Sequence, residues 1–302
     1  MFRHAHLSDL HLGPLPPVPL RALAGKRLLG WLSWRTGRER THRPEVLDAL
    51  VRDLHVARPD HVVITGDLVN LALPEEFALA AAWLEALGPP AWISVVPGNH
   101  DALVALDRRR SLDRWAAYMA SDDGLGDGVA PFPWLRRRGP LAIIGLSSAV
   151  ATPPGLATGQ IGEAQLAALE TMLAGLVGDP ACRVVLLHHP PLDGACVRRK
   201  RLVDAAKLRR VLATYGADLV LHGHVHALVR GTLPARSGPI QVYGAPSASN
   251  LDPRPEASAQ YQIYGIERAG AGWRIAIETR RYLPATAAFA HAETHLAEPV
   301  GA

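Results

Sequence analysis

The chain has 302 residues, of which 48% are hydrophobic, and it carries a formal net charge of +4. This length and apolar content supply a sizeable core and favour one α/β domain, while the basic charge gives weak support for an anionic substrate or surface. The two cysteines exclude a disulfide framework, and the lack of a signal-like leader or of an apolar run near ~20 residues predicts a cytoplasmic protein without a membrane span.

Apolar runs and amphipathic helical segments alternate along most of the chain, which predicts an α/β fold. Strands are expected at residues 2–7, 61–65, 92–96, 141–146, 183–187 and 218–221. Helices are expected at residues 44–57, 74–87, around 108–110, 162–176 and 202–215. Later segments alternate as strands, at residues 228–233, 239–243, 260–268 and 272–282. They predict a second, more antiparallel sheet packed on the first.

Residues 14–42 interrupt this alternation with four prolines, two tryptophans and many arginines, and we interpret them as a basic amphipathic insertion or cap. A loop rich in glycine and aspartate is expected at residues 121–129. The last residues, 285–302, are rich in alanine and lack periodicity, which predicts a loosely ordered tail. A single domain is therefore expected to span residues 1–284.

Five polar clusters each follow an apolar run, at the point where a predicted strand ends. In chain order they are Asp9-Leu10-His11, Gly66-Asp67, Pro97-Gly98-Asn99-His100-Asp101, His188-His189-Pro190 and Gly223-His224-Val225-His226. Open α/β sheets place their chemistry at the carboxyl ends of strands. Aspartate, asparagine and histidine offer the mixed oxygen and nitrogen ligands that suit two divalent ions such as Mn, Fe, Zn or Co. The clusters therefore predict a metal site with two ions.

These clusters, spread from residue 2 to about residue 230, resemble the calcineurin-like metallophosphoesterase superfamily. Residues 97–101, 188–191 and 221–226 are most similar to its bacterial cyclic nucleotide and glycerophosphodiester phosphodiesterases. The resemblance implies a metallophosphoesterase-type four-layer α/β/β/α sandwich of two packed mixed β-sheets flanked by helices. It also implies seven metal ligands: Asp9, His11 and His226 for the first ion, Asn99, His188 and His224 for the second, and Asp67 as the bridge.

The same resemblance implies catalytic roles for Asp67, Asn99 and His100. His100 lies outside the ligand pattern and matches the general acid or transition-state stabiliser of the family. In part of the superfamily an acidic residue orients this histidine, but Asn70 stands at the matching position, and its amide is expected to accept a hydrogen bond from the ring without adding charge. Asp101 is expected either to add charge or to cap a helix. His189 and His222 stand beside ligands and are candidates for orienting them.

The predicted function is hydrolysis of a phosphate ester, with a diester favoured over a monoester, by a metal-activated hydroxide. Two alternatives stay open. The insertion suggests a pyrophosphohydrolase of a nucleotide-linked lipid, similar to UDP-diacylglucosamine hydrolases, although Asn99-His100 departs from the Asn-Arg expected there. A non-catalytic scaffold of the same fold would lack ligands or His100, and all are present. Nucleic acid is disfavoured as a partner, because no aromatics interleave the basic runs at 108–110, 136–138 and 198–201.

The insertion leaves directly from the loop of Asp9 and His11, so it is expected to border the site and to shape which substrates enter. Helical spacing from residue 20 to residue 34 places apolar side chains on one broad side and Gly30 on the other. The favoured interpretation is a cap whose apolar side is core. The alternative is a peripheral contact with anionic lipid at the inner face of the membrane, next to a wall that admits a lipid substrate. The sequence does not determine the substrate, the metals or the oligomeric state.

Overall fold

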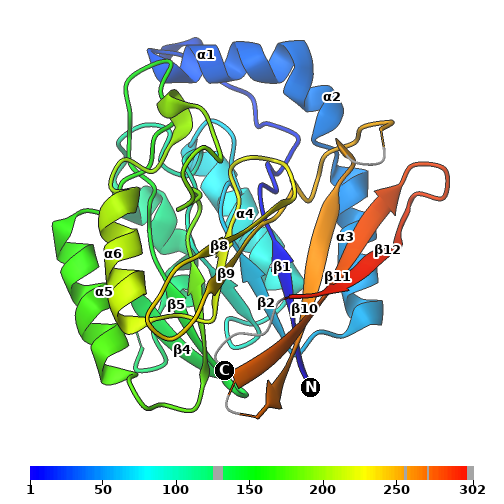
Figure 1. Cartoon of the computed structure of the whole chain (residues 1–302). Helices are drawn as coiled ribbons and strands as arrows, with labels where there is room; N and C mark the ends of the chain where they lie inside the picture. The colour runs from blue at the N-terminus through cyan, green and yellow to red at the C-terminus, as the bar shows by residue number, and fades with distance from the viewer. Residues whose placement is uncertain (125–131, 255–256, 271, 298–302) are drawn as a thin grey trace.

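Two six-stranded mixed sheets lie face to face at the centre of the protein, and helices cover the outer face of each (Figure 1). The computed structural model describes residues 1–124, 132–254, 257–270 and 272–297. Apolar side chains fill the space between the sheets and the space beneath the helices. This arrangement confirms the predicted fold of two packed mixed sheets flanked by helices.

The first sheet combines three parallel strands with an antiparallel meander. β1 (Phe2–Leu7), β2 (His61–Ile64) and β3 (Ile93–Val95) are parallel neighbours. On the other side of β1 follow β10 (Gln260–Ala269), β11 (Gly272–Leu283) and β12 (Ala288–Leu296), all antiparallel. Every residue of β2 and β3 is buried, as expected for parallel strands that are covered on both faces.

The second sheet has a parallel centre and antiparallel edges. β5 (Leu141–Gly145), β6 (Cys182–Leu186), β7 (Leu219–His222) and β9 (Ile240–Gly244) are parallel in that order. β4 (Trp134–Arg138) pairs with β5, and β8 (Val229–Leu233) pairs with β9, both antiparallel. The carboxyl ends of the parallel strands therefore meet at one edge of this sheet.

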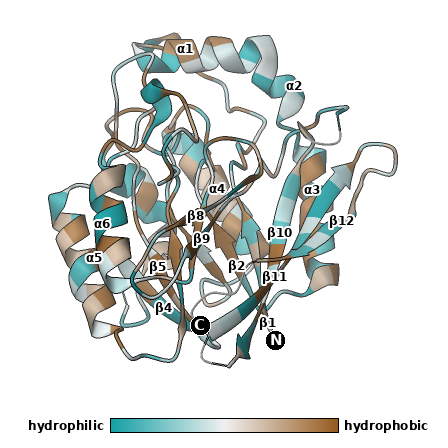
Figure 2. Ribbon diagram, viewed as in Figure 1, coloured by the Kyte–Doolittle hydropathy of each residue, from teal (hydrophilic) through white to brown (hydrophobic). Residues whose placement is uncertain are grey.

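Four helices form the outer layers. α3 (Pro44–Ala57) and α4 (Pro74–Leu87) begin with a proline, which suits a first helical turn because the N–H that proline lacks would have no partner there. Both share the hydrophobic core of the first sheet, while α5 (Glu163–Gly175) and α6 (Ala205–Tyr215) pack on the second. Figure 2 shows hydrophobic residues concentrated on the central strands and both kinds of residue on the surrounding helices.

The strands after residue 226 do not form a sheet of their own, which contradicts the prediction. β8 and β9 extend the second sheet, whereas β10, β11 and β12 extend the first. Alternation along a strand indicates that one of its faces is buried, but it carries no information about which strand edge accepts its hydrogen bonds. The division between the two sheets is therefore a property of the tertiary structure.

Two local predictions are also wrong, and one further strand lies in a segment for which no element is predicted. The expected helix around 108–110 consists of 3-10 turns, with non-helical backbone at Trp115. The missed strand is β4, in which Arg136 is buried and lies over the ring of Trp134. Much of the expected loose tail is β12, whose main chain pairs with β11 although most of its side chains are exposed. The expectations for residues 125–129 and 298–302 lie outside the described residues.

The insertion lies across the carboxyl ends of the strands as a series of short helices (Figure 1). It consists of the 3-10 turn η1 (Leu20–Ala22), α1 (Lys26–Ser33), the π-helical turn η2 (Trp34–Arg38) and α2 (Glu39–Thr41). Gly25, with a φ of 60°, separates η1 from α1 and so divides the helical segment expected from residue 20 to residue 34.

α1 turns the side that contains Gly30 toward the protein. A Cβ atom on Gly30 would lie 2.7 Å from the side chain of Leu71, and Arg27 donates to the carbonyl oxygen of Leu71 over 3.0 Å. The leucines of α1 are instead 41%, 51% and 44% exposed, in the order Leu28, Leu29 and Leu32. The interpretation of α1 as a cap whose apolar side is core is therefore right for Trp31, which packs against the core, and for the buried Trp34 that follows α1. It is wrong for Leu28 and Leu32, because the glycine allows the helix backbone itself to approach the core.

Candidate metal centre

The candidate ligands lie in loops that follow five strands. Asp9 and His11 follow β1, Asp67 follows β2, Asn99 follows β3, His188 follows β6, and His224 and His226 follow β7. Because these strands are parallel within each sheet and the sheets pack face to face, the loops converge at one edge of the sandwich. The insertion lies above the same edge (Figure 1).

The four residues expected to hold the first ion form a compact group. Ligand atoms of Asp9, His11, Asp67 and His226 all lie within 4.8 Å of one another. Nε2 of His226 is 3.0 Å from Oδ1 of Asp9, and Nε2 of His11 is 3.9 Å from Oδ2 of Asp67. Oδ1 of Asp9 is buried, and the ring of His226 is its nearest polar partner among the interactions described. Buried oxygen and nitrogen atoms in this arrangement suit a divalent cation.

The residues expected to hold the second ion adjoin the same carboxylate. Nε2 of His188 lies 3.4 Å from Oδ2 of Asp67 and 3.2 Å from Oδ1 of Asn99. The ring of His224 packs edge-on against His188, with centroids 5.1 Å apart. Asp67 therefore lies between the two predicted groups, in the position that a bridging ligand requires.

Main-chain carbonyls orient two of the histidine rings. His188 donates from Nδ1 to the carbonyl oxygen of Thr65 over 2.6 Å, and His224 donates from Nε2 to that of Lys200 over 2.9 Å. A carbonyl oxygen only accepts hydrogen bonds, so the nitrogen that faces it carries the proton and the other one is left for a metal. Histidines that bind metals usually have such a partner.

The electrostatic interaction between Asp67 and His188 shifts the pKa of both side chains. Burial by itself would raise the pKa of Asp67, but the neighbouring rings of His188 and His100 hold that pKa well below its usual range. Burial would also lower the pKa of His188, yet the carboxylates of Asp67 and Asp9 raise it to about 9. The carboxylates of Asp67 and Asp9 thus favour a positive charge in the space between them. A divalent cation would supply that charge.

Backbone strain is concentrated in the same loops. Positive φ values, rare for residues other than glycine, occur at five of the predicted ligands: 52° at Asp9, 44° at His11, 56° at Asp67, 71° at His224 and 57° at His226. Such conformations cost about 1–3 kcal/mol each and persist where the surrounding structure imposes them, often at functional sites. The strain supports a functional role for these loops.

Asp101 holds the turn that presents Asp67. Its carboxylate accepts hydrogen bonds of 2.8–3.0 Å from the main-chain N–H groups of Asp67, Leu68, Val69 and Gly98. It does not cap a helix, which was one of the two expectations. Gly98 is required beside it, because a Cβ atom there would collide with Oδ1 of Asp67.

His100 points into the site, but Asn70 does not orient it as expected. The ring donates from Nδ1 to the main-chain oxygen of Asn70 over 2.7 Å, whereas the side-chain amide of Asn70 turns away and donates to the carbonyl of Leu12. The predicted contact between amide and ring is therefore wrong. Burial, together with the charge of Arg38, lowers the pKa of His100 to about 4.

The two neighbouring histidines differ in their contacts. The ring of His189 packs against those of His188 and His224, with centroid distances of 5.1 and 4.3 Å, and its Nδ1 lies 2.8 Å from the hydroxyl of Ser148. His222 donates to the carbonyl of Gly223 and, within the described residues, contacts none of the predicted ligand rings. An orienting role remains a prediction for His189 and loses support for His222.

Arg38 enters the site from the insertion and was not predicted. It ends η2, and its guanidinium lies 2.7 Å from Nε2 of His11 and 3.1 Å from Nε2 of His100. In the sequence Arg38 is one of many arginines of the basic amphipathic insertion. The only available signal was the position of the insertion directly after the Asp9 and His11 loop.

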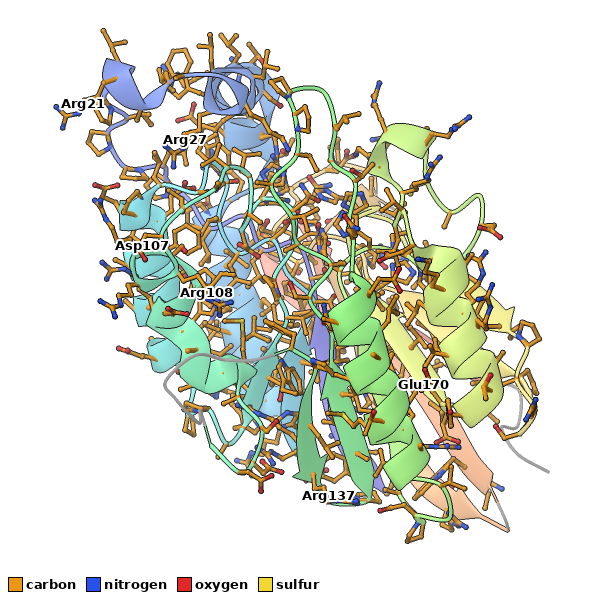
Figure 3. All side chains as sticks on the ribbon, turned by 90° about the vertical axis from the view of Figure 1, so that its left-hand side faces the viewer. Arg21, Arg27, Asp107, Arg108, Arg137 and Glu170 are labelled. Atoms are coloured by element: carbon orange, nitrogen blue, oxygen red, sulfur yellow. The ribbon has the colours of Figure 1, made fainter. Side chains whose placement is uncertain are left out.

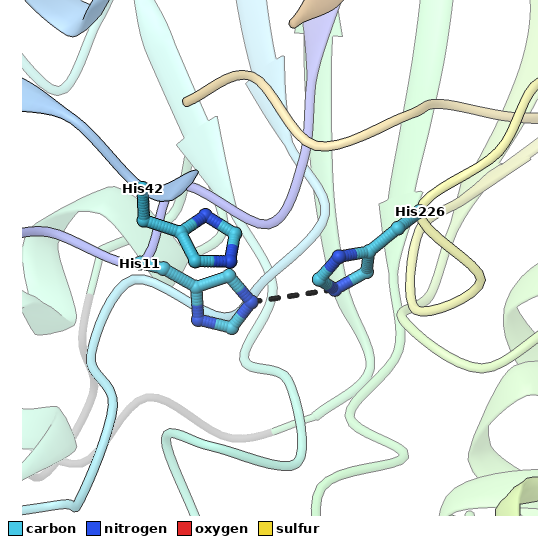
Figure 4. A group of neighbouring side chains, drawn as sticks. All are labelled: His11, His42 and His226. Atoms are coloured by element: carbon cyan, nitrogen blue, oxygen red, sulfur yellow. Dashed lines mark hydrogen bonds between the residues drawn. The ribbon is translucent and has the colours of Figure 1, made fainter. Parts of the chain in front are cut away.

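His42 is a second residue that the insertion contributes. It lies beside His11 and His226 (Figure 4), and one ring nitrogen of each lies within 4.8 Å of the others. The hydroxyl of Ser249 holds Nδ1 of His42 over 2.8 Å. His42 is therefore a further candidate nitrogen ligand of the first group.

A cavity of about 250 Å³ adjoins the candidate centre and contains Asn99 and His100 in its wall. α1 and η2 form one side of it, and Leu103, Leu156, Arg199 and Lys200 form the rest. The insertion thus borders the site. A larger apolar cavity of about 460 Å³, between Leu15 and Trp83, contains none of the predicted site residues.

Curated relatives are similar to this chain in sequence. A probable cyclic nucleotide phosphodiesterase of Rhodococcus erythropolis is 31% identical over 192 residues, which is 62% of this chain and 57% of that protein. A probable glycerophosphodiester phosphodiesterase of Arcobacter nitrofigilis is 31% identical over 218 residues, 68% of this chain and 70% of that protein. The match thus spans little more than half of the first relative.

Solved structures share the fold. A dimetal phosphatase from Danio rerio superposes with a TM-score of 0.65 at 15% identity, and 98% of each chain is covered. A purple acid phosphatase from yellow lupin gives a TM-score of 0.61 at 13% identity, over 98% of this chain and 53% of that one. The family model described as calcineurin-like phosphoesterase matches residues 2–228, which include every loop of the candidate centre. By this match and this geometry, the chain belongs to the calcineurin-like phosphoesterase family.

Proposed function

We propose that the protein hydrolyses phosphodiesters with two divalent metal ions. The observation that carries the proposal is the position of Asp67, which lies 3.9 Å from Nε2 of His11 and 3.4 Å from Nε2 of His188, between the two candidate ligand groups. Membership of the family and the names of the relatives support it. The pyrophosphohydrolase and scaffold alternatives are not favoured, because both relatives are named as phosphodiesterases and the candidate ligands are present together.

Two divalent ions, when bound, supply positive charge for the phosphoryl oxygens and lower the pKa of the attacking water. The residues of the chain position the reactants. Asp67 joins the two halves of the centre, and Asp101 fixes the turn that carries it. His100 presents Nε2 to the site, and because Nδ1 donates to the carbonyl of Asn70, the ring can give a proton to the leaving oxygen only in its protonated form, in which Nε2 no longer accepts from Arg38. The adjoining cavity offers space for the leaving group.

Metal removal tests this proposal. We expect two ions per chain in active protein, and we expect a chelator to abolish hydrolysis of bis(4-nitrophenyl) phosphate. Activity should return when Mn²⁺, Fe²⁺, Zn²⁺ or Co²⁺ is added, because the candidate ligands offer the oxygen and nitrogen atoms that suit these ions. Two ions are expected because the candidate ligands are too many for one tetrahedral ion. The number of metal ions per chain, from elemental analysis, is compared with the turnover rate of the same samples. Full activity with one ion per chain or fewer would contradict the two-metal proposal.

We further propose that α1 makes peripheral contact with an anionic membrane and that the substrate includes a lipid phosphodiester. The exposed leucines of α1 lie among exposed arginines at positions 21, 35 and 40, and Figure 3 shows Arg21 at the outer edge of the protein. Apolar side chains that enter the headgroup boundary beside cations are typical of interfacial helices.

Within the described residues no helix is long and apolar enough to cross a membrane. The cytoplasmic location stays a prediction.

The double variant Leu28→Gln/Leu32→Gln tests the membrane contact. Cosedimentation with phosphatidylglycerol vesicles should fall about tenfold or more, since each leucine buries part of a side chain worth ~1.5–3 kcal/mol when fully buried. Val56→Gln is the matched control, because Val56 is 77% exposed on α3. Equal sedimentation of the wild type and the double variant would reject the contact.

The basic runs give no support to a nucleic-acid partner. Arg108 pairs with Asp113 at 3.2 Å, and Arg137 pairs with Asp179 at 2.5 Å. Figure 3 shows Arg108 and Arg137 on separate parts of the protein. These two runs therefore do not line one groove along which a polyanion could bind, and the third run contributes Arg199 and Lys200 to the wall of the cavity beside the candidate centre.

A further inference from the structure

Arg38 differs from the other arginines of the insertion because its guanidinium faces the candidate centre. Nη1 lies 3.1 Å from Nε2 of His100, and Nη2 lies 2.9 Å from Nδ1 and 2.7 Å from Nε2 of His11. η2, which ends at Arg38, is a π-helical turn, a feature often found at functional sites. The insertion therefore delivers a positively charged group to the rings of His11, a candidate ligand, and His100, the candidate general acid.

The partners that Arg38 has in this structure do not neutralise it. None of the ion pairs within the described residues joins Arg38 to a carboxylate. A guanidinium can only donate, and a neutral imidazole offers one acceptor nitrogen. Once that nitrogen of His11 binds a metal, as proposed, it no longer accepts from Arg38. An N–H group of the guanidinium is then available to an anion.

His100 fits this arrangement. Its Nδ1 donates to the carbonyl of Asn70, so Nε2 is the acceptor that faces Arg38. The ring thus holds the guanidinium in place at the wall of the cavity, which Arg38 shares with Asn99 and His100. Asn70 stands where part of the superfamily has an acidic residue, so His100 receives no carboxylate charge from that position. The fixed positive charge beside the ring comes from Arg38.

We propose that Arg38 binds a non-bridging oxygen of the phosphoryl group and stabilises the negative charge that it carries during hydrolysis. The planar fork of arginine matches phosphate oxygens in geometry as well as charge. Cations placed in this way on a transferring phosphoryl group act most strongly where water is excluded. This inference rests on the proposed hydrolysis, and it makes the insertion part of the catalytic site.

Arg38→Met and Arg38→Lys test the inference, with Arg52→Met as the control because Arg52 is exposed on α3, away from the insertion. Metal content, kcat, KM and the binding of inorganic phosphate to metal-loaded protein are measured for each. Arg38→Met should keep both ions, lower kcat by ~10²–10³-fold, as the loss of one oxyanion donor does, and weaken phosphate binding about tenfold or more. Arg38→Lys should recover part of the phosphate affinity, because it restores the charge without the fork. Arg52→Met should match the wild type.

Wild-type kcat and phosphate affinity in Arg38→Met would overturn the inference. Loss of a metal ion in Arg38→Met would also overturn it, because Arg38 would then act by holding the ligands. Calorimetric titration with phosphate needs no turnover. If the wild type loaded with two ions hydrolysed no diester, the proposed function would fail, while the difference in phosphate affinity between wild type and Arg38→Met would still decide the role of Arg38.

Discussion

Replacement of Asp67 by alanine is expected to remove metal binding and hydrolysis together. The carboxylate lies within 4 Å of ring nitrogens from both candidate ligand groups, so its loss separates the two halves of the centre and leaves the remaining ligands unbridged. Metal ions contribute several kcal/mol of charge stabilisation to the transition state. At 1.36 kcal/mol per factor of ten, turnover should fall by ~10³–10⁴-fold or more.

The second variant for this position is Asp67→Asn. Asp67 has a φ of 56°, a conformation that alanine adopts with strain and asparagine tolerates, so the asparagine variant separates loss of charge from backbone damage. Elemental analysis, circular dichroism and turnover are measured on both. Asp193→Ala is the control, since its side chain is 84% exposed in an ion pair with Arg209. Two bound ions and near-normal turnover in Asp67→Asn would contradict the bridging role.

Replacement of His100 by alanine is expected to keep both ions and to slow turnover by ~10²–10⁴-fold, the range typical of a proton-transfer group. The ring is not among the candidate ligands, and its Nε2 faces the site while Nδ1 donates to the carbonyl of Asn70. The measurement compares a diester with a 4-nitrophenolate leaving group and one with an alkoxide. A general acid should matter more for the alkoxide, which needs a proton to leave.

The same comparison separates two roles of His100. If the ring only holds Arg38 through the 3.1 Å contact, both substrates should slow by the same factor. His291→Ala is the control, because His291 is exposed on β12. Near-normal turnover of the alkoxide substrate in His100→Ala, below and above saturation, would exclude both roles.

Much of the fold could be predicted because burial leaves a local period in the sequence. α3 and α4 begin and end where their patterns indicated, and a proline marks the start of each. The candidate ligands could be found for a related reason. Each polar cluster directly follows a buried strand, and parallel strands end at the same edge of a sheet, so a linear pattern is sufficient to bring Asp9, Asp67 and Asn99 together.

The side of α1 that faces the core could not be predicted from the sequence. Spacing placed Leu28 and Leu32 inside, but Gly30 lets the helix backbone approach Leu71, and the leucines remain exposed. β12 escaped prediction for a similar reason. It joins the sheet through main-chain hydrogen bonds to β11, and its exposed side chains leave no apolar alternation.

The sequence by itself indicated the family and the strands after which the candidate ligands lie, and it predicted which residues those ligands are. Only the tertiary structure decided which sheet each late strand joins, how Asn70 meets His100, and that Arg38 and His42 enter the site. His42 meets Ser249 across 207 residues of chain, and Arg38 meets His100 across 62. Periodicity records how deeply a residue is buried, but not which distant residue it meets, because that depends on how the segments pack against one another.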